Sequence, residues 1–124
     1  MGFFTGFLTA GLYVMAGNSL GGALRPMSCE KAVPLEQSYV KKYDAACTKQ
    51  QSKVTATQTK IDTATVSSTD TSLSAKAQKK AANDLRRYKR LILNYQKLAN
   101  RDCGNLSKAE TRLDTVINKC QAPT

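Results

Sequence analysis

The sequence predicts an all-α protein, in which an apolar N-terminal helix inserts into a membrane and an antiparallel helical hairpin, held by disulfides, follows it. Three observations lead to this prediction. Residues 1–24 carry no charged side chain. Through the rest of the chain, apolar and small residues recur at steps of three and four. Four cysteines lie nearly symmetrically about residue 75, the middle of this remaining part. The 124 residues leave room for one soluble domain. We therefore divide the chain into an apolar transmembrane or leader segment, residues 1–25, and a basic helical domain, residues 26–124.

The apolar segment has the length of a membrane-spanning helix. Residues 3–24 are uncharged, and 22 residues of helix span about 33 Å, the thickness of one hydrocarbon core. Gly2 with Gly6, and Gly17 with Gly21, place small residues four apart, the spacing at which helices pack closely in lipid. We therefore expect a membrane helix that packs against protein neighbours. The alternatives are a secretory signal cleaved after Ala16 and a segment buried within an assembly.

The first helix of the hairpin is predicted over residues 35–66, after Pro34. Its residues form a heptad seam, in which polar side chains complete the alternating steps of three and four. The seam consists of Val40, Tyr43, Cys47, Gln50, Val54, Thr57, Ile61 and Ala64. Residues 67–74 are almost all Ser, Thr and Asp, which compete for backbone hydrogen bonds and favour turns. The chain is therefore expected to reverse direction there.

A second long helix is predicted from Ala75 to about Gly104. Its apolar stripe again steps by three and four, through Leu85, Tyr88, Ile92, Tyr95 and Ala99. Ser107 and Glu110 have the spacing of a capping box. We therefore expect a short third helix over residues 107–119, with Leu113, Val116, Ile117 and Cys120 on one side.

The cysteines indicate disulfides in an oxidising compartment, because an even number of them occurs in a small chain with an apolar leader. The alternatives are four reduced thiols in a cytosolic protein and a zinc site of four thiolates, which the long cysteine spacings disfavour. In an antiparallel hairpin, facing residues have a constant sum of residue numbers. This sum is 149 for Cys29 and Cys120 and 150 for Cys47 and Cys103, which favours these two nested cross-links. They imply a turn centred on residue 75, whereas the Ser/Thr run is centred near residue 70. Local pairing of Cys29 with Cys47 and of Cys103 with Cys120 is the alternative.

Charge is confined to the helical domain. All 19 Lys and Arg and all 9 Asp and Glu lie from Arg25 onward, so this part carries the net charge of +10 and is attracted to anionic surfaces. The second helix holds the densest group of cations, opposed there by Asp84 and Asp102. We predict an anionic-surface binding face, with a solvated helix face as the alternative, made of Lys76, Lys79, Lys80, Arg86, Arg87, Lys89, Arg90, Lys97 and Arg101.

Catalysis is not expected of this chain. It has no histidine, which removes the commonest general base and metal ligand, and no glycine-rich phosphate loop follows a strand. We therefore expect neither an enzyme nor a bound metal or cofactor.

The predicted function is that of a structural or assembly subunit of a membrane-associated multi-protein complex. A secretion or pilus apparatus, an organellar complex or a membrane-contacting virion component would fit. We expect the protein to be membrane-associated, with its soluble part in an oxidising compartment: the periplasm, the extracellular space, the intermembrane space or a virion. The expected partners are other subunits, in a homo- or hetero-oligomer, and the membrane. The alternative is a membrane-tethered or particle-packaged protein that binds nucleic acid or another acidic surface, although nucleic acid is the less favoured partner.

Overall fold

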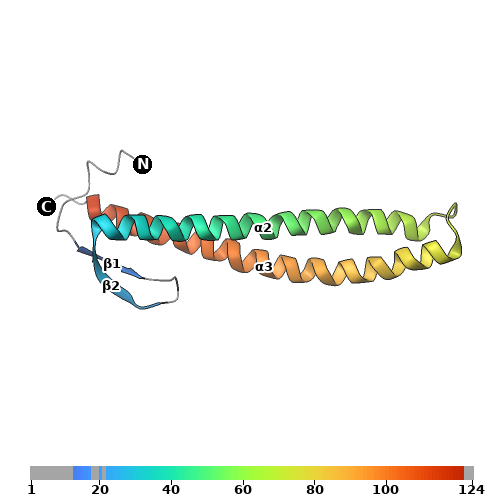
Figure 1. The fold of residues 1–124 in the computed structure, drawn as a ribbon, viewed down its shortest axis with the longest axis horizontal. Helices are drawn as coiled ribbons and strands as arrows, with labels where there is room; N and C mark the ends of the chain where they lie inside the picture. Colours follow the sequence, from blue (N-terminus) through green and yellow to red (C-terminus); the bar gives the residue numbers. More distant parts are fainter. Residues whose placement is uncertain (1–12, 18–19, 21, 122–124) are drawn as a thin grey trace. The chain divides into compact units, whose positions relative to one another are not determined.

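A computed structural model describes residues 13–17, 20 and 22–121 of the chain. Strands β1 (Tyr13–Gly17) and β2 (Leu24–Ser28) precede two long helices, α2 (Cys29–Thr69) and α3 (Ala75–Gln121) (Figure 1). The two helices pack antiparallel, as the sequence predicts. The residues group into two compact units: a terminal unit, Met1–Ala45 with Cys103–Thr124, and a middle unit, Ala46–Asp102.

The N-terminal region contains a β-hairpin where the sequence predicted a continuous helix over residues 3–24. β1 pairs antiparallel with β2, from Tyr13 opposite Ser28 to Gly17 opposite Leu24. Val14 and Ala16 are buried while Tyr13 and Met15 are exposed, which is the two-residue period of a strand. The helical prediction is therefore wrong at residues 13–17. Within the described part of the chain, no helix is both long and apolar enough to span a bilayer, and the predicted packing residues Gly2, Gly6 and Gly21 lie outside that part.

Helix α2 is longer than predicted at both ends. It starts at Cys29, directly after β2, and contains Pro34, which cannot donate a backbone hydrogen bond to the preceding turn. The first turns nevertheless form, because Cys29, Ala32 and Val33 are buried in the core. At the other end, the hydroxyls of Ser68 and Thr69 both donate to the carbonyl of Thr65, at 2.9 and 3.3 Å, and this Ser/Thr run remains helical.

The connection between the helices is a short loop, residues 70–74, that is stabilised by its own polar side chains. The Asp70 carboxylate accepts hydrogen bonds from the Ser72 backbone N–H at 2.9 Å and from the Ser72 hydroxyl at 2.6 Å. The Ser74 hydroxyl accepts from the Ala77 N–H at 3.1 Å and so caps the start of α3. The side chain of Gln78 donates to the Asp70 carbonyl at 2.5 Å, which holds the loop against the first turn of α3.

Helix α3 is a single element, so the predicted third helix, residues 107–119, is wrong as a separate helix. A Cβ added at Gly104 would meet no atom within 4 Å, and the helix passes through this exposed glycine without a break. A glycine within a helix costs only about 1 kcal/mol. The seam continues on both sides of it, with Ala99 before it and Leu106 and Ala109 after it, and the burial of these residues outweighs this cost.

Both helices keep an uninterrupted heptad phase, as predicted for their central parts. Every residue of each seam is buried or half-buried. The α2 seam is Cys29, Val33, Glu36, Val40, Tyr43, Cys47, Gln50, Val54, Thr57, Ile61, Ala64 and Ser68. The α3 seam is Gln78, Ala81, Leu85, Tyr88, Ile92, Tyr95, Ala99, Asp102, Leu106, Ala109, Leu113, Val116 and Cys120. Polar residues that complete the spacing, such as Gln50 and Thr57, therefore occupy true seam positions.

The main hydrophobic core lies in the terminal unit, where the β-hairpin packs on the helices. Val14 and Ala16 of β1 join Cys29, Ala32 and Val33 of α2 and Val116 and Cys120 of α3, and Met27, Leu113 and Ile117 pack against this cluster. A disulfide joins Cys29 to Cys120, with Cα atoms 5.8 Å apart. It therefore closes the core covalently.

The observed disulfide excludes the alternative of local pairing. Cys47 and Cys103 are also disulfide-bonded, and no cysteine is free. Two disulfides in a chain of this size indicate an oxidising, non-cytosolic environment.

Replacing both Cys29 and Cys120 with alanine is expected to lower the free energy of unfolding by about 3 to 4 kcal/mol, because the cross-link closes a loop in the unfolded chain. The sequence separation of this pair is 91, but the second disulfide lies within this span and shortens the loop that Cys29 and Cys120 close. Urea unfolding followed by the helical circular-dichroism signal measures the change. An unfolding free energy equal to that of the parent chain would contradict the prediction.

Hydrogen bonds from the Ser72 side chain and backbone lower the pKa of Asp70 below its ordinary value of 3.8. The lowered pKa means that the ionised carboxylate stabilises the loop above the ordinary pKa, and that this stabilisation is lost as pH falls through the folded-state value. The carboxyl carbon signal of Asp70, followed by NMR, should titrate below pH 3.8. Ser72→Ala should raise this midpoint, whereas Thr71→Ala, at a residue between the two, should leave it unchanged.

Candidate anionic-surface interface

The nine predicted cations of α3 form one continuous exposed face, which we call the basic face. All nine are exposed and all lie in the middle unit. Eight occupy the three heptad positions farthest from the seam, and Lys89 lies nearer to it. The structure therefore brings the whole predicted set together on one side of a single helix.

Most of the net charge belongs to the middle unit. It holds twelve Lys and Arg against four Asp and Glu, a net charge of +8, whereas the rest of the chain holds seven against five, a net charge of +2. The middle unit therefore has three basic side chains for every acidic one. The electrostatic field that would attract an anionic partner therefore originates mainly from residues 46–102.

The acids of α3 neutralise only part of the basic face. Asp84 pairs with Arg87 at 3.4 Å and Asp102 with Arg101 at 3.1 Å, and both pairs have an exposed arginine. The pair of Arg87 with Asp84 lies at the surface and stabilises a fold little. Both pairs leave the arginine accessible. Arg86 donates to the side chain of Asn83. Among the described residues, no carboxylate pairs with Lys76, Lys79, Lys80, Arg86, Lys89, Arg90 or Lys97.

The tyrosines among these cations belong to the seam, as predicted, and their rings are covered by lysines. The Nζ of Lys60 lies 5.7 Å from the Tyr88 ring centroid, and the Nζ of Lys53 lies 5.4 Å from that of Tyr95. The two lysines are seven residues apart on α2 and the two tyrosines are seven apart on α3, so the same cation–π contact is repeated one heptad later. The rings therefore stabilise the helix pair and are not free to stack on a ligand.

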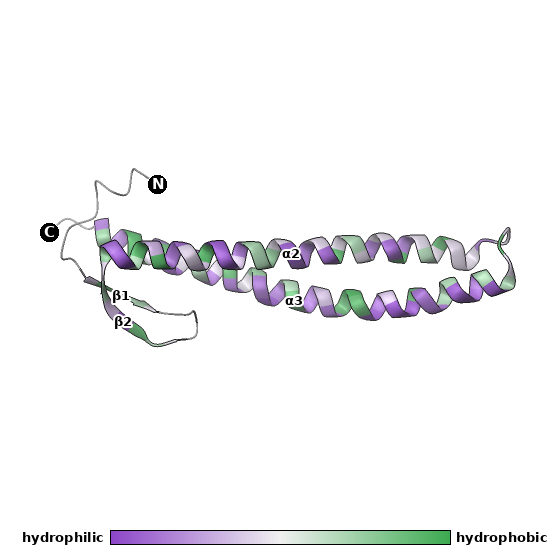
Figure 2. Ribbon diagram, in the orientation of Figure 1, coloured by the Kyte–Doolittle hydropathy of each residue, from purple (hydrophilic) through white to green (hydrophobic). Residues whose placement is uncertain are grey.

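An exposed leucine lies within the basic face, and sequence reasoning missed it. The side chain of Leu93 is 67% exposed. On the helix its neighbours at steps of three and four include Lys89, Arg90 and Lys97. In Figure 2 the green apolar band in the middle of α3 contrasts with the hydrophilic turns around it. The sequence signal was the apolar run of residues 91–93, of which only Ile92 fits the seam.

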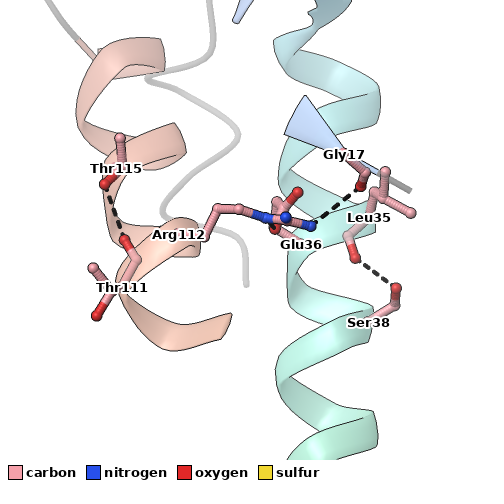
Figure 3. A network of polar contacts seen from close by, with 7 residues as sticks. All are labelled: Gly17, Leu35, Glu36, Ser38, Thr111, Arg112 and Thr115. Carbon is pink, nitrogen blue, oxygen red and sulfur yellow. Dashed lines mark hydrogen bonds and ion pairs between the residues drawn. The ribbon is translucent and has the colours of Figure 1, made fainter. Parts of the chain in front are cut away.

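A second polar site, in the terminal unit, ties the β-hairpin to both helices (Figure 3). The Arg112 Nε of α3 donates to the Glu36 Oε2 of α2 at 2.5 Å, and the Arg112 Nη2 donates to the Gly17 carbonyl of β1 at 3.2 Å. The guanidinium also lies 5.5 Å from the Tyr39 ring centroid. Gly17 thus ends a strand, rather than occupying the membrane-helix packing position that the sequence predicted.

This polar contact lies in the protein interior. Glu36 is fully buried, and its Oε1 has no hydrogen-bond partner in the part of the chain that the structure describes. A buried carboxylate without a partner lowers the stability of the fold. Arg112 therefore offsets the cost of burying Glu36. Sequence reasoning missed this pair, although its residue numbers sum to 148, close to the sums of 149 and 150 for the cysteines; the two residues are 76 positions apart and meet through the helix register.

The described residues include no cluster of three or more His, Cys, Asp or Glu that could hold a metal ion. Glu36 pairs with Arg112, and Asp84 and Asp102 pair with arginines of α3. These three acidic side chains therefore serve as ion-pair partners, whereas Asp62 and Asp70 accept hydrogen bonds from Gln58 and Ser72.

Replacing Arg112 with methionine should lower the free energy of unfolding by about 3 kcal/mol or more, because the buried Glu36 carboxylate would lose its partner. Replacing both Glu36 and Arg112 with methionine should cost less than the single change. Urea unfolding of the two single variants and the double variant measures the coupling. The control is Arg87→Met, which breaks an exposed pair and should cost less than about 1 kcal/mol. Equal losses for Arg112→Met and Arg87→Met would contradict the prediction.

Comparison with known proteins adds no relative from which a function could be transferred. No protein-family description, no curated protein and no solved structure matches this chain.

Proposed function

We propose that the chain is a structural subunit of a multi-protein assembly at a membrane, in an oxidising compartment. Its terminal unit docks onto neighbouring subunits, and its paired helices act as a spacer. A secretion or pilus apparatus, an organellar complex or a membrane-contacting virion component would need such a part. The observation that carries the proposal is an exposed apolar surface on the β-hairpin.

This surface, the hairpin face, consists of Tyr13, Met15, Leu24 and Pro26. Cross-strand partners lie on the same side of a sheet, and the register pairs Met15 with Pro26 and places Leu24 opposite Gly17. The opposite side of the hairpin, with Val14 and Ala16, packs into the core. Tyr13 is 65% exposed, Met15 44% and Leu24 48%. An apolar surface exposed in this way is typical of a docking site.

The sequence next to the hairpin face is also apolar. Residues 1–12 directly precede β1, carry no charge and include Phe3, Phe4 and Phe7. The hairpin face and this segment together would supply a long uncharged contact. This continuity supports docking by the terminal unit onto other subunits or into their membrane environment.

Contacts within the terminal unit hold the β-hairpin in place without a partner. The Cys29 to Cys120 disulfide closes the core beneath it, and Arg112 fixes the end of β1 through the Gly17 carbonyl. Surfaces ordered in advance lose less conformational entropy on binding. The terminal unit therefore has the properties of a rigid docking platform.

The helices themselves are suited to spacing. α2 has 41 residues and α3 has 47, and at 1.5 Å per residue their contour lengths are about 60 and 70 Å. Their seams hold many small or polar residues, including Ala81, Ala99 and Thr57, which pack a thin helix pair with no thick core. The length of these paired helices supports the proposed role as a spacer.

A second candidate function is binding of nucleic acid or another acidic surface, and the exposed basic face favours it. Phosphate contacts through lysine and arginine weaken steeply as salt rises. Retention on DNA at low salt only would favour this second function, whereas co-purification with other subunits at high salt would favour the first.

Substituting the hairpin face is expected to release the chain from its assembly. Met15→Asp with Leu24→Asp places charges in the apolar contact and should reduce the fraction that sediments with large complexes at least about tenfold, because each buried charge opposes docking. Sucrose-gradient sedimentation at high salt, from the cells that make the protein, measures this fraction.

The matched control is Val66→Asp with Leu73→Asp, which adds the same charge at exposed apolar residues of the middle unit, 67% and 38% exposed. This control should sediment like the parent chain. A parent chain that sediments alone at high salt would refute the proposal.

A further inference from the structure

We infer that the basic face binds a lipid bilayer that carries anionic headgroups, and that Leu93 enters the boundary between headgroups and acyl chains. This inference rests on the proposed function for the presence of a membrane, and it names the surface along which the middle unit lies. The juxtaposition of one exposed leucine with lysines and arginines, on one side of one helix, leads to it.

Leu93 lies at the centre of the face. Arg86 precedes it by one heptad on the same strip of the helix, and Lys89, Arg90 and Lys97 are neighbours at steps of four, three and four. At 67% exposure, the leucine contributes little to the core of the middle unit. Its side chain therefore points outward among cationic side chains.

An anionic bilayer would bind both the cations of the basic face and the exposed leucine. Long lysine and arginine side chains reach headgroup phosphates while their stems, and an apolar side chain between them, contact the acyl boundary. The cations that no carboxylate neutralises provide the attraction, and the net charge of +8 on the middle unit strengthens it. The leucine adds an attraction that salt does not screen.

A nucleic acid would bind the cations of the basic face but not the exposed leucine. Its phosphates would bind the cations, but an exposed leucine offers nothing to a phosphate backbone. Single-stranded bases would need free aromatic rings, and Tyr88 and Tyr95 are half-buried under Lys60 and Lys53. The two disulfides also indicate a non-cytosolic environment. These observations together favour lipid.

The test measures binding of the full-length, disulfide-bonded chain to vesicles, by flotation. One set of vesicles contains one part phosphatidylglycerol to two parts phosphatidylcholine, and the other contains phosphatidylcholine alone. The chain should float with the anionic vesicles only, and its affinity should fall about tenfold or more between low and half-molar salt.

Leu93→Ser should weaken binding to the anionic vesicles by roughly tenfold, and the loss should persist at high salt, because the leucine contribution is apolar. The matched control is Val66→Ser, at a residue with the same exposure of 67% on α2, and it should bind like the parent. Neither residue lies on a seam, and an unchanged helical circular-dichroism signal verifies folding.

Removing three charges from the face, with Arg86→Gln, Arg90→Gln and Lys97→Gln, should weaken binding by about a hundredfold at low salt. The control removes three exposed lysines elsewhere, with Lys41→Gln, Lys49→Gln and Lys108→Gln, and should have a much smaller effect. This comparison separates the basic face from net charge.

Tryptophan reports insertion directly, because the chain has none of its own. The emission of Leu93→Trp should shift to shorter wavelength when anionic vesicles are added, whereas that of Val66→Trp should not. Equal binding to both vesicle types, an unshifted Leu93→Trp spectrum, or tighter binding of a DNA duplex that Leu93→Ser leaves unchanged would each overturn the inference. The vesicle assay needs no other subunit, so its failure would leave the sedimentation result for the hairpin face intact.

Discussion

The uninterrupted heptad phase of α2 and α3 is the constraint on which the rest of the structure depends. It fixes which side of each helix faces the other. The facing pairs Lys53 with Tyr95 and Lys60 with Tyr88, whose residue numbers sum to 148, show the antiparallel register. In the terminal unit the same sum holds for Glu36 and Arg112, and that of the Cys29 to Cys120 disulfide is 149. Once the seam is fixed, the position of every other side chain on each helix follows from the helical period.

A seam of this composition needs support from other interactions. Alanines, Thr57 and Gln50 bury little apolar surface, so hydrophobic packing alone stabilises the middle unit weakly. Lysines over tyrosine rings supply contacts at the edge of the seam, and the disulfides restrict the unfolded chain. Among the described residues, the apolar core cluster lies in the terminal unit, where the β-hairpin adds side chains to those of the two helices. Hydrophobic packing therefore stabilises the terminal unit more than the middle unit.

The two proposed contact surfaces differ in chemistry because they arise from different elements. The hairpin face is uncharged, and it is exposed because a two-stranded sheet has one side against the core and one side without a partner. The basic face is charged because it occupies the heptad positions farthest from a seam, where side chains are free of packing constraints. Under the two proposals, the terminal unit would dock to protein and the middle unit would lie on an anionic surface.

Periodicity was sufficient to predict the central parts of the seams and the shared face of the cations, because a helix of fixed pitch converts residue spacing directly into position. The near-symmetric placement of the cysteines favoured the pairing of Cys29 with Cys120. The turn was predicted from the Ser/Thr run, and α2 extends into that run as far as Thr69. Periodicity could not predict the β-hairpin, since uncharged residues such as Val14 and Ala16 suit a membrane helix as well as a buried strand, and only the core that receives them decides. The predicted break near Gly104 was wrong for a related reason, because the seam buried on both sides outweighs one unfavourable residue. The contact of Glu36 with Arg112 and Gly17 joins three distant segments, and tertiary packing alone brings them within hydrogen-bonding distance.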